Sequence, residues 1–282
     1  MPVCDVCFRH CKIEENATGF CGGRTCRNGQ IVAANYGKLT SIALDPIEKK
    51  PFKMFRPGSK VLSLGSYGCN LRCPFCQNSS ISWSQKAFEY KNTAEYYPPE
   101  EIVQSALSLR DHGNIGIAFT YNEPLIGYEF VRDTARLAKQ AGLENVLVTN
   151  GTATLKVLDE ISPYIDAMNI DLKAFSASFY KNLLDGDFQM TKEFIEAAVQ
   201  VCHVELTTLI IPGENDSEQQ MLEQSGWIAS LEKQYNKKIP LHITRFFPAF
   251  KLTDKVPTPV NTIMRLVETA KQNLDFVFAG NV

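Results

Sequence analysis

The chain has 282 residues, and its 29 Lys and Arg against 31 Asp and Glu give a formal net charge of −2. This near balance excludes a general nucleic-acid binder, which would show a clear basic excess, and no apolar run is long enough to cross a bilayer. Hydrophobic residues at 44% and charged residues at 21% are typical of a folded globular protein. The first residues show no basic and apolar leader, so we expect a cytoplasmic protein that binds no membrane.

The N-terminal region is expected to differ from the rest of the chain. Residues 1–30 are rich in cysteine and glycine with little apolar periodicity, and residues 31–44 alternate as one or two short strands would. Residues 45–58 contain three prolines and predict an irregular connector. We therefore expect a cysteine-rich segment with its connector over residues 1–58 and a second domain over residues 59–282.

Strand and helix patterns alternate through the second domain. Such alternation predicts parallel βαβ units with right-handed crossovers. Six strand–helix units and a last strand are too few for a closed eight-stranded barrel, so we expect an α/β fold, either a partial (β/α)6 barrel or an open sheet. The expected strands are 60–66, 115–119, 145–149, 165–172, 203–211, 239–246 and 275–279, and the expected helices are 98–112, 127–141, 153–161, 176–184, 191–202, 217–235 and 260–273.

Eight of the nine cysteines lie within the first 76 residues, in two groups. Cysteines spaced by two or three residues in a reducing compartment hold metal more often than they form disulfides. The second group, Cys69, Cys73 and Cys76, follows the first strand of the second domain with C-x3-C-x2-C spacing. A structural zinc ion ordinarily needs four protein ligands, whereas a 4Fe–4S cluster on three cysteines keeps one iron open. A zinc loop with its fourth ligand elsewhere is the alternative.

The motif CNLRCPFC at residues 69–76 resembles the cluster loop of the radical S-adenosylmethionine (SAM) superfamily, with Phe75 at the family's aromatic position. The resemblance implies a radical SAM partial barrel and a 4Fe–4S cluster held by Cys69, Cys73 and Cys76. In the family, the open iron binds SAM. One-electron reduction, from a donor such as flavodoxin or ferredoxin, then gives methionine and a 5′-deoxyadenosyl radical that abstracts hydrogen from a substrate.

Other loops at the carboxyl ends of the expected strands are interpreted through the same resemblance. After the second strand, family members carry Gly-Gly-Glu; here Asn122 and Glu123 match by place, without the glycines, and the acid would meet the cofactor's ammonium group. Asp171 and Lys173 form a D-L-K pattern whose lysine would meet the cofactor's carboxylate. The other cofactor-facing candidates are Asn150 for the ribose, Pro212 for the adenine, and His242. A turn, a surface ion pair and a core histidine are the corresponding structural alternatives.

The first cysteine group has the spacing C-x2-C-x3-C-x9-C. Four thiolates suit a zinc ion, which would fold a segment too short to build its own core. An auxiliary Fe–S cluster is the alternative, and Cys26 or His10 could replace one ligand. The expected ligands are Cys4, Cys7, Cys11 and Cys21.

The combination of motifs resembles one branch of the superfamily, the radical SAM enzyme of the AmmeMemoRadiSam system, which is similar to pyruvate formate-lyase activating enzyme. The resemblance rests on the cysteine knuckle, on DPIEKKP at residues 45–51, on YNEP at residues 121–124 and on the terminal GNV at residues 280–282. It implies partner proteins from that system. Three functions stay open: hydrogen abstraction from a small-molecule or partner-borne substrate, activation of a glycyl radical enzyme at a backbone glycine, and a zinc-stabilised binding module without activity.

Overall fold

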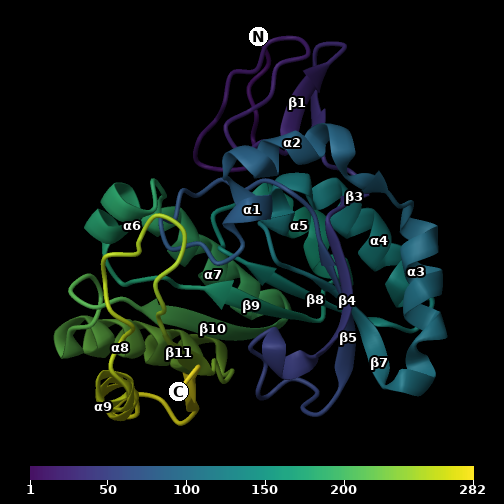
Figure 1. Cartoon of the computed structure of the whole chain (residues 1–282). Helices are drawn as coiled ribbons and strands as arrows, with labels where there is room; N and C mark the ends of the chain where they lie inside the picture. The colour runs from purple at the N-terminus through teal and green to yellow at the C-terminus, as the bar shows by residue number, and fades with distance from the viewer.

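Seven parallel strands and one antiparallel edge strand form the main sheet of the computed structural model, which describes residues 1–282 (Figure 1). Across the sheet the order is β12-β11-β10-β9-β8-β7-β5-β4. Since β12 and β4 do not pair with each other, the sheet stays open, in keeping with the expected partial barrel. The strands are β4 (Ser41–Pro46), β5 (Lys60–Gly65), β7 (Asn114–Phe119), β8 (Glu144–Thr149), β9 (Ala167–Asp171), β10 (His203–Ile210), β11 (Leu241–Arg245) and β12 (Val277–Gly280).

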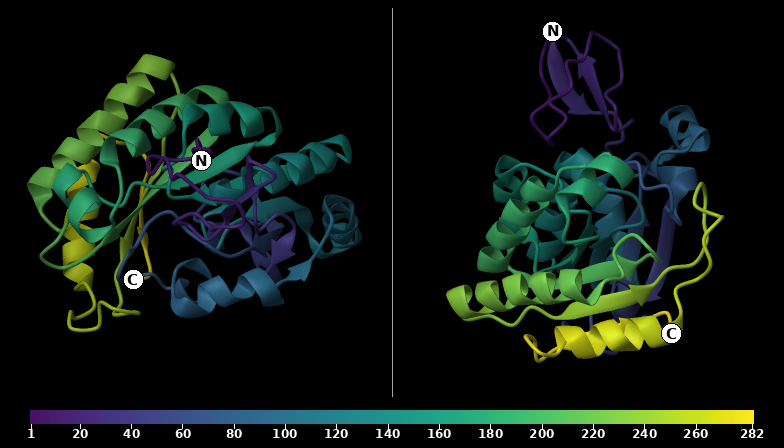
Figure 2. Two further views of the ribbon diagram at one scale, coloured as in Figure 1. Left: turned by 90° about the horizontal axis from the view of Figure 1, so that it is seen from above. Right: turned by 90° about the vertical axis from the view of Figure 1, so that its left-hand side faces the viewer.

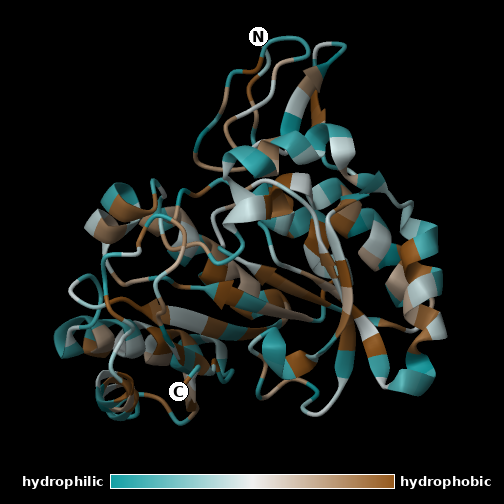
Figure 3. Ribbon diagram, in the orientation of Figure 1, coloured by the Kyte–Doolittle hydropathy of each residue, from teal (hydrophilic) through white to brown (hydrophobic).

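Helices connect the parallel strands, and apolar residues concentrate along the strands and the helix faces that pack on them (Figures 2 and 3). Ser176, Asp187 and Ser217 cap three of these helices, each side chain accepting a hydrogen bond from the N–H three residues on. None of the helices has both the length and the apolar character needed to cross a membrane. The connecting helices are α3 (Pro99–Ser108), α4 (Tyr128–Gln140), α5 (Leu155–Ile161), α6 (Ala177–Leu183), α7 (Phe188–Val201), α8 (Glu218–Tyr235) and α9 (Val260–Ala270).

All strands and helices expected between residues 59 and 282 are present, with ends that differ by a few residues. The sequence did not predict α1 (Ser79–Ser82), α2 (Gln85–Thr93) or β6 (Glu95–Tyr96). Helix α2 buries only Ala87, so it has no apolar periodicity that could have revealed it.

The N-terminal segment forms a small lobe that projects from the α/β body (Figure 2). It contains a hairpin of β1 (Arg24–Arg27) and β2 (Gln30–Ala33), and β3 (Lys38–Leu39) then pairs with β6. Strand β4 leaves the lobe and pairs antiparallel with β5 across its whole length. A unit cut at residue 59 would therefore leave β5 without its edge partner, and the division into 1–58 and 59–282 stays a prediction.

A buried carboxylate anchors the connector to the sheet. Glu205 on β10 is fully buried and accepts hydrogen bonds from His203 at 3.0 Å and His242 at 2.7 Å. It also accepts from the backbone N–H groups of Lys53 and Met54, at 2.9 and 2.8 Å. Burial alone would raise the pKa of Glu205, but these hydrogen bonds outweigh it and lower the pKa to about 2.

Glu205→Gln is expected to destabilise the fold by about 3 kcal/mol, because the amide cannot accept all of these hydrogen bonds. The lowered pKa means that the carboxylate's contribution is complete above the ordinary value of 4.5 and is lost as the pH falls through about 2. Urea unfolding at about pH 7 and about pH 3 measures this, and the difference between wild type and variant should shrink at the lower pH. Exposed Glu223→Gln on α8 is the control, expected within about 0.5 kcal/mol. Equal unfolding midpoints for wild type and Glu205→Gln would contradict this role.

Candidate active site

A cavity of about 370 Å³ opens where the loops after β5, β7, β8 and β9 meet. These loops all leave the carboxyl ends of parallel strands, where ligand sites form in such folds. The structure therefore gathers residues as far apart in the chain as Lys49 and Lys173. Its lining includes the predicted residues Cys69, Cys73, Cys76, Asn122, Glu123, Asn150, Asp171 and Lys173.

The loop that carries the three cysteines is held close to the N-terminal lobe. The Cys69 N–H donates to the carbonyl of Cys21 at 3.0 Å, and the Cys76 N–H donates to the carbonyl of Cys73 at 3.3 Å. Gly68 has a φ of +94°, and a Cβ at this position would lie 2.5 Å from the Cys21 carbonyl oxygen. Only glycine fits this close approach, so the backbone of the cysteine loop packs directly against the backbone of the lobe.

The three thiols of this loop suit a metal cluster. Burial raises the pKa of Cys73 to about 12 and the pKa of Cys69 well above its usual value, and it also raises that of Cys76. Without a cation they are neutral thiols, and a bound metal centre would hold them as thiolates. No three His, Cys, Asp or Glu side chains are already closed on one point as a metal-ion site. The cysteines instead line a cavity with room for more than one ion, which fits a cluster with an open position.

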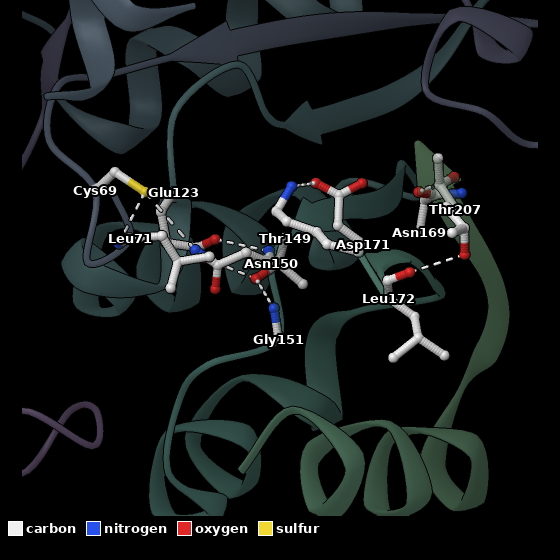
Figure 4. Close-up of polar contacts among 12 residues, drawn as sticks. Cys69, Leu71, Glu123, Thr149, Asn150, Gly151, Asn169, Asp171, Leu172 and Thr207 are labelled. Carbon is white, nitrogen blue, oxygen red and sulfur yellow. Dashed lines mark hydrogen bonds and ion pairs between the residues drawn. The ribbon is translucent and has the colours of Figure 1, made fainter. Parts of the chain in front are cut away.

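Glu123 braces the loops around Cys69 (Figure 4). Its buried carboxylate accepts from the Thr149 hydroxyl at 2.7 Å, the Asn150 N–H at 2.8 Å and the Leu125 N–H at 3.0 Å. Burial raises the pKa of Glu123 to about 7 in spite of these bonds. Three of its four acceptor positions are occupied by these hydrogen bonds and about one remains free. In this structure Glu123 therefore joins the loop after β7 to the end of β8 and the loop that follows it.

Two asparagines extend this brace to the cysteine loop. The Asn150 side-chain amide donates to Asn70 Oδ1 at 2.9 Å and lies 3.7 Å from the Cys69 sulfur. Asn122 accepts from the Ser66 N–H at 2.9 Å and donates to the Gly68 carbonyl at 3.1 Å. Both residues thus position the backbone and the sulfur of the cysteine loop.

Asp171 and Lys173 form an ion pair at 2.8 Å on the wall of the same cavity. Burial lowers the pKa of Lys173, but the Asp171 carboxylate outweighs this effect and raises it above its usual value. The expected pair of opposite charges at the mouth of the sheet is therefore present, with a lysine that stays charged beside the cysteines.

Three predicted residues do not line the cavity. Phe75 is buried behind the cysteines in a cluster of apolar side chains, and the Pro212 carbonyl accepts from Lys255 at 2.9 Å. His242 is the second residue of β11, below the carboxyl edge of the sheet, where it contacts Glu205. The structure therefore favours the alternative of a core histidine for His242.

A charged network on the cavity wall was not predicted from the sequence. Lys50 is almost fully buried, donates to Asp45 at 2.8 Å and lies 4.3 Å from the centre of the Tyr121 ring. The Tyr121 hydroxyl donates to the same carboxylate at 2.5 Å, and Tyr121 has a left-handed φ of 71°. Burial would raise the pKa of Asp45, but these partners lower it. The only feature of the sequence that could have indicated this network is the run of charged residues at 45–50, within a segment predicted to be an irregular connector.

Comparisons with known proteins agree with this site. The model of the radical SAM superfamily matches residues 64–224. The protein MJ0808 of Methanocaldococcus jannaschii, which is uncharacterized, is 39% identical over 282 residues, covering 99% of this chain and 81% of that protein. Pyruvate formate-lyase 1-activating enzyme of Escherichia coli K12 is 26% identical over 157 residues, covering 54% of this chain and 61% of that enzyme. Streptococcus suis SuiB bound to SAM shares the fold, with a TM-score of 0.57 and 12% identity over 77% of this chain and 48% of SuiB.

Proposed function

The chain belongs to the radical SAM superfamily and is an enzyme of that superfamily, and from this premise we propose that Cys69, Cys73 and Cys76 hold its 4Fe–4S cluster. The observation that carries this proposal is the convergence of the three cysteines on one cavity whose lining holds no fourth cysteine and no histidine. When bound, the cluster and SAM supply reductive cleavage of the sulfonium and a radical that abstracts hydrogen. The family also implies a one-electron donor, for which flavodoxin or ferredoxin are our candidates.

We assign the remaining lining residues to two tasks. Glu123, Asn122 and Asn150 keep the cysteine loop in place through the hydrogen bonds described above, with one Glu123 acceptor position left for a cationic ligand group. Lys173 supplies a positive charge for the cofactor's carboxylate, and Asp171 holds that lysine in position. Aromatic and apolar side chains behind the cysteines, including Phe75, keep water from the site.

We propose that the hydrogen comes from a small-molecule or partner-borne substrate and that the enzyme acts in the AmmeMemoRadiSam system. The proposal is supported by the network of Asp45, Lys50 and Tyr121, because it joins the DPIEKKP and YNEP motifs of that branch at the cavity wall. Buried Lys50 and its neighbour Lys49 make this wall suited to a substrate with an acidic group. The cytoplasm, where thiols stay reduced, is the compartment we propose for the nine free cysteines.

The experiment that tests the function is anaerobic reconstitution with iron and sulfide, followed by reduction in the presence of SAM. We expect methionine and 5′-deoxyadenosine in equal amounts, and neither product without the reductant. Protein that takes up zinc but no iron at Cys69, Cys73 and Cys76 would exclude the radical reaction and leave a binding module.

The activase alternative has its own isotope test. A candidate glycyl radical enzyme, deuterated at the glycine α-carbon, should transfer no deuterium into 5′-deoxyadenosine under our proposal. The AmmeMemoRadiSam partner proteins, fully deuterated and carrying their bound small molecules, should transfer it. Transfer from the labelled glycine would replace our substrate proposal by the activase reaction, which the name of the E. coli relative supports.

A further inference from the structure

Four of the five cysteines of the N-terminal lobe surround a small cavity that has no part in the proposed radical reaction. This cavity, of about 10 Å³, is lined by Cys4, Cys7, Cys11 and Cys21 together with Arg24. We propose that the four thiolates bind one zinc ion and that the Arg24 guanidinium is its buried positive partner.

The choice of four ligands among five cysteines follows from their positions. Cys26 does not line the cavity, and its sulfur donates to the Glu15 carboxylate at 3.4 Å. His10 is exposed and does not line the cavity either. In the structure, therefore, the four cysteines with C-x2-C-x3-C-x9-C spacing line one cavity, and the additional thiol of Cys26 lies outside it.

The size of the cavity favours a single ion over an auxiliary cluster. A volume of about 10 Å³ is near that of one water-sized probe, whereas the cavity at Cys69 measures about 370 Å³. Apolar side chains, among them Val6, Ile13 and Ile126, close the walls of the smaller cavity. No three of these thiols are placed to hold an ion as they stand. A zinc ion with bonds of about 2.3 Å would draw the sulfurs inward as their protons leave.

The side chain of Arg24 independently indicates that the cavity takes a negatively charged group. Its side chain is almost completely buried, and its Nη1 pairs with Glu129 at 2.7 Å. Its Nε, however, is buried without any hydrogen-bond partner. Zinc with four thiolates carries two negative charges. A thiolate sulfur next to Arg24 would accept a hydrogen bond from the free Nε–H, and the guanidinium would offset part of the negative charge of the zinc site.

The site lies directly behind the catalytic loop. The carbonyl of Cys21, one of the four ligands, accepts the Cys69 N–H at 3.0 Å, and Arg9 Nε donates to the carbonyl of Asn70 at 2.8 Å. Because a bound ion would fix the position of Cys21, the zinc site would also buttress the loop that holds the cluster.

The test uses the full chain with Cys69, Cys73 and Cys76 all changed to alanine, so that bound metal reports on the lobe alone. We expect about one zinc per chain by elemental analysis, no iron, and an absorption spectrum typical of tetrahedral thiolate coordination after exchange with Co²⁺. Iron with sulfide in this protein, or no metal at all, would overturn the proposal. Neither result depends on whether the wild-type protein cleaves SAM.

Variants of this cluster-free protein test the ligand set and the role of Arg24. Cys11→Ala should lower zinc affinity at least tenfold in chelator competition, whereas Cys26→Ala should leave it unchanged; the reverse pattern would refute the assignment. If Cys11→Ala does not fold, the unchanged zinc content of Cys26→Ala and the release of one zinc by a thiol-blocking mercurial decide the matter. Arg24→Lys keeps the charge but removes the Nε donor, so we expect a shift of the Co²⁺–thiolate absorption bands, and identical bands would exclude an Arg24–sulfur contact.

Discussion

Cys73→Ala is expected to lower the production of 5′-deoxyadenosine by reconstituted, reduced protein to the background, a loss of at least about a thousandfold, or about 4 kcal/mol. The side chain of Cys73 lines the cavity together with the other two cysteines of its loop, and alanine leaves only two protein ligands for the cluster. Iron and sulfide content should fall together with the activity. Product analysis by chromatography and metal analysis of the same samples measure both.

The matched control for this prediction is Cys202→Ala. Cys202 is also a buried, free cysteine, but it lies between α7 and β10 and does not line the catalytic cavity. We expect full iron content and activity within about twofold of wild type, since only a small side chain is shortened. Undiminished product formation by Cys73→Ala would refute our assignment of the cluster ligands.

Glu123→Gln is expected to lower kcat/KM for SAM about a hundredfold, equivalent to about 3 kcal/mol. The carboxylate accepts three hydrogen bonds, from Thr149, Asn150 and Leu125, and a glutamine amide presents an N–H₂ group to at least one of these donors. The misplaced amide should displace Asn150, which lies 3.7 Å from the Cys69 sulfur. SAM cleavage kinetics, with the iron content of the variant, measure the effect.

Thermal unfolding separates the two roles that Glu123 can have. As a brace it should lower the melting temperature by about 5 °C when changed to glutamine, together with the loss of activity. As a contact to the cofactor's ammonium group alone, the same change would raise KM and leave the melting temperature unchanged, which would contradict the brace. Glu223→Gln on the exposed face of α8 should alter neither quantity.

For Glu123, the sequence predicted the position of the residue but not its hydrogen-bond partners. Its position after the second parallel strand was sufficient to place it at the cavity, because such loops converge in this fold. Its partners were not predictable, since Thr149 at the end of β8 and Asn150 in the loop after it meet Glu123 only when β7 and β8 pair. The same reason hid Lys50, which the sequence assigned to a connector but which the pairing of β4 with β5 brings to the cavity.

The errors in the expectations also have physical causes. Alternation along β11 indicated only that His242 faces one side, and the depth of the residue below the carboxyl edge decided that it meets Glu205 and not the cavity. Helix α2 was missed because Ala87 is the only residue that it buries. For the lobe, local spacing could not exclude Cys26, which the β1–β2 hairpin places beside Glu15.

The sequence by itself determined the class of the fold, the order of its parallel strands and helices, and the three-cysteine loop, because periodicity and ligand spacing are local properties of the chain. Only the tertiary structure decided which distant side chains contact one another: Glu123 with Asn150, Lys50 with Tyr121, and Arg24 with Glu129. These pairs depend on strand pairing and on the burial of charges, whose energies exist only once segments far apart in the chain have come together.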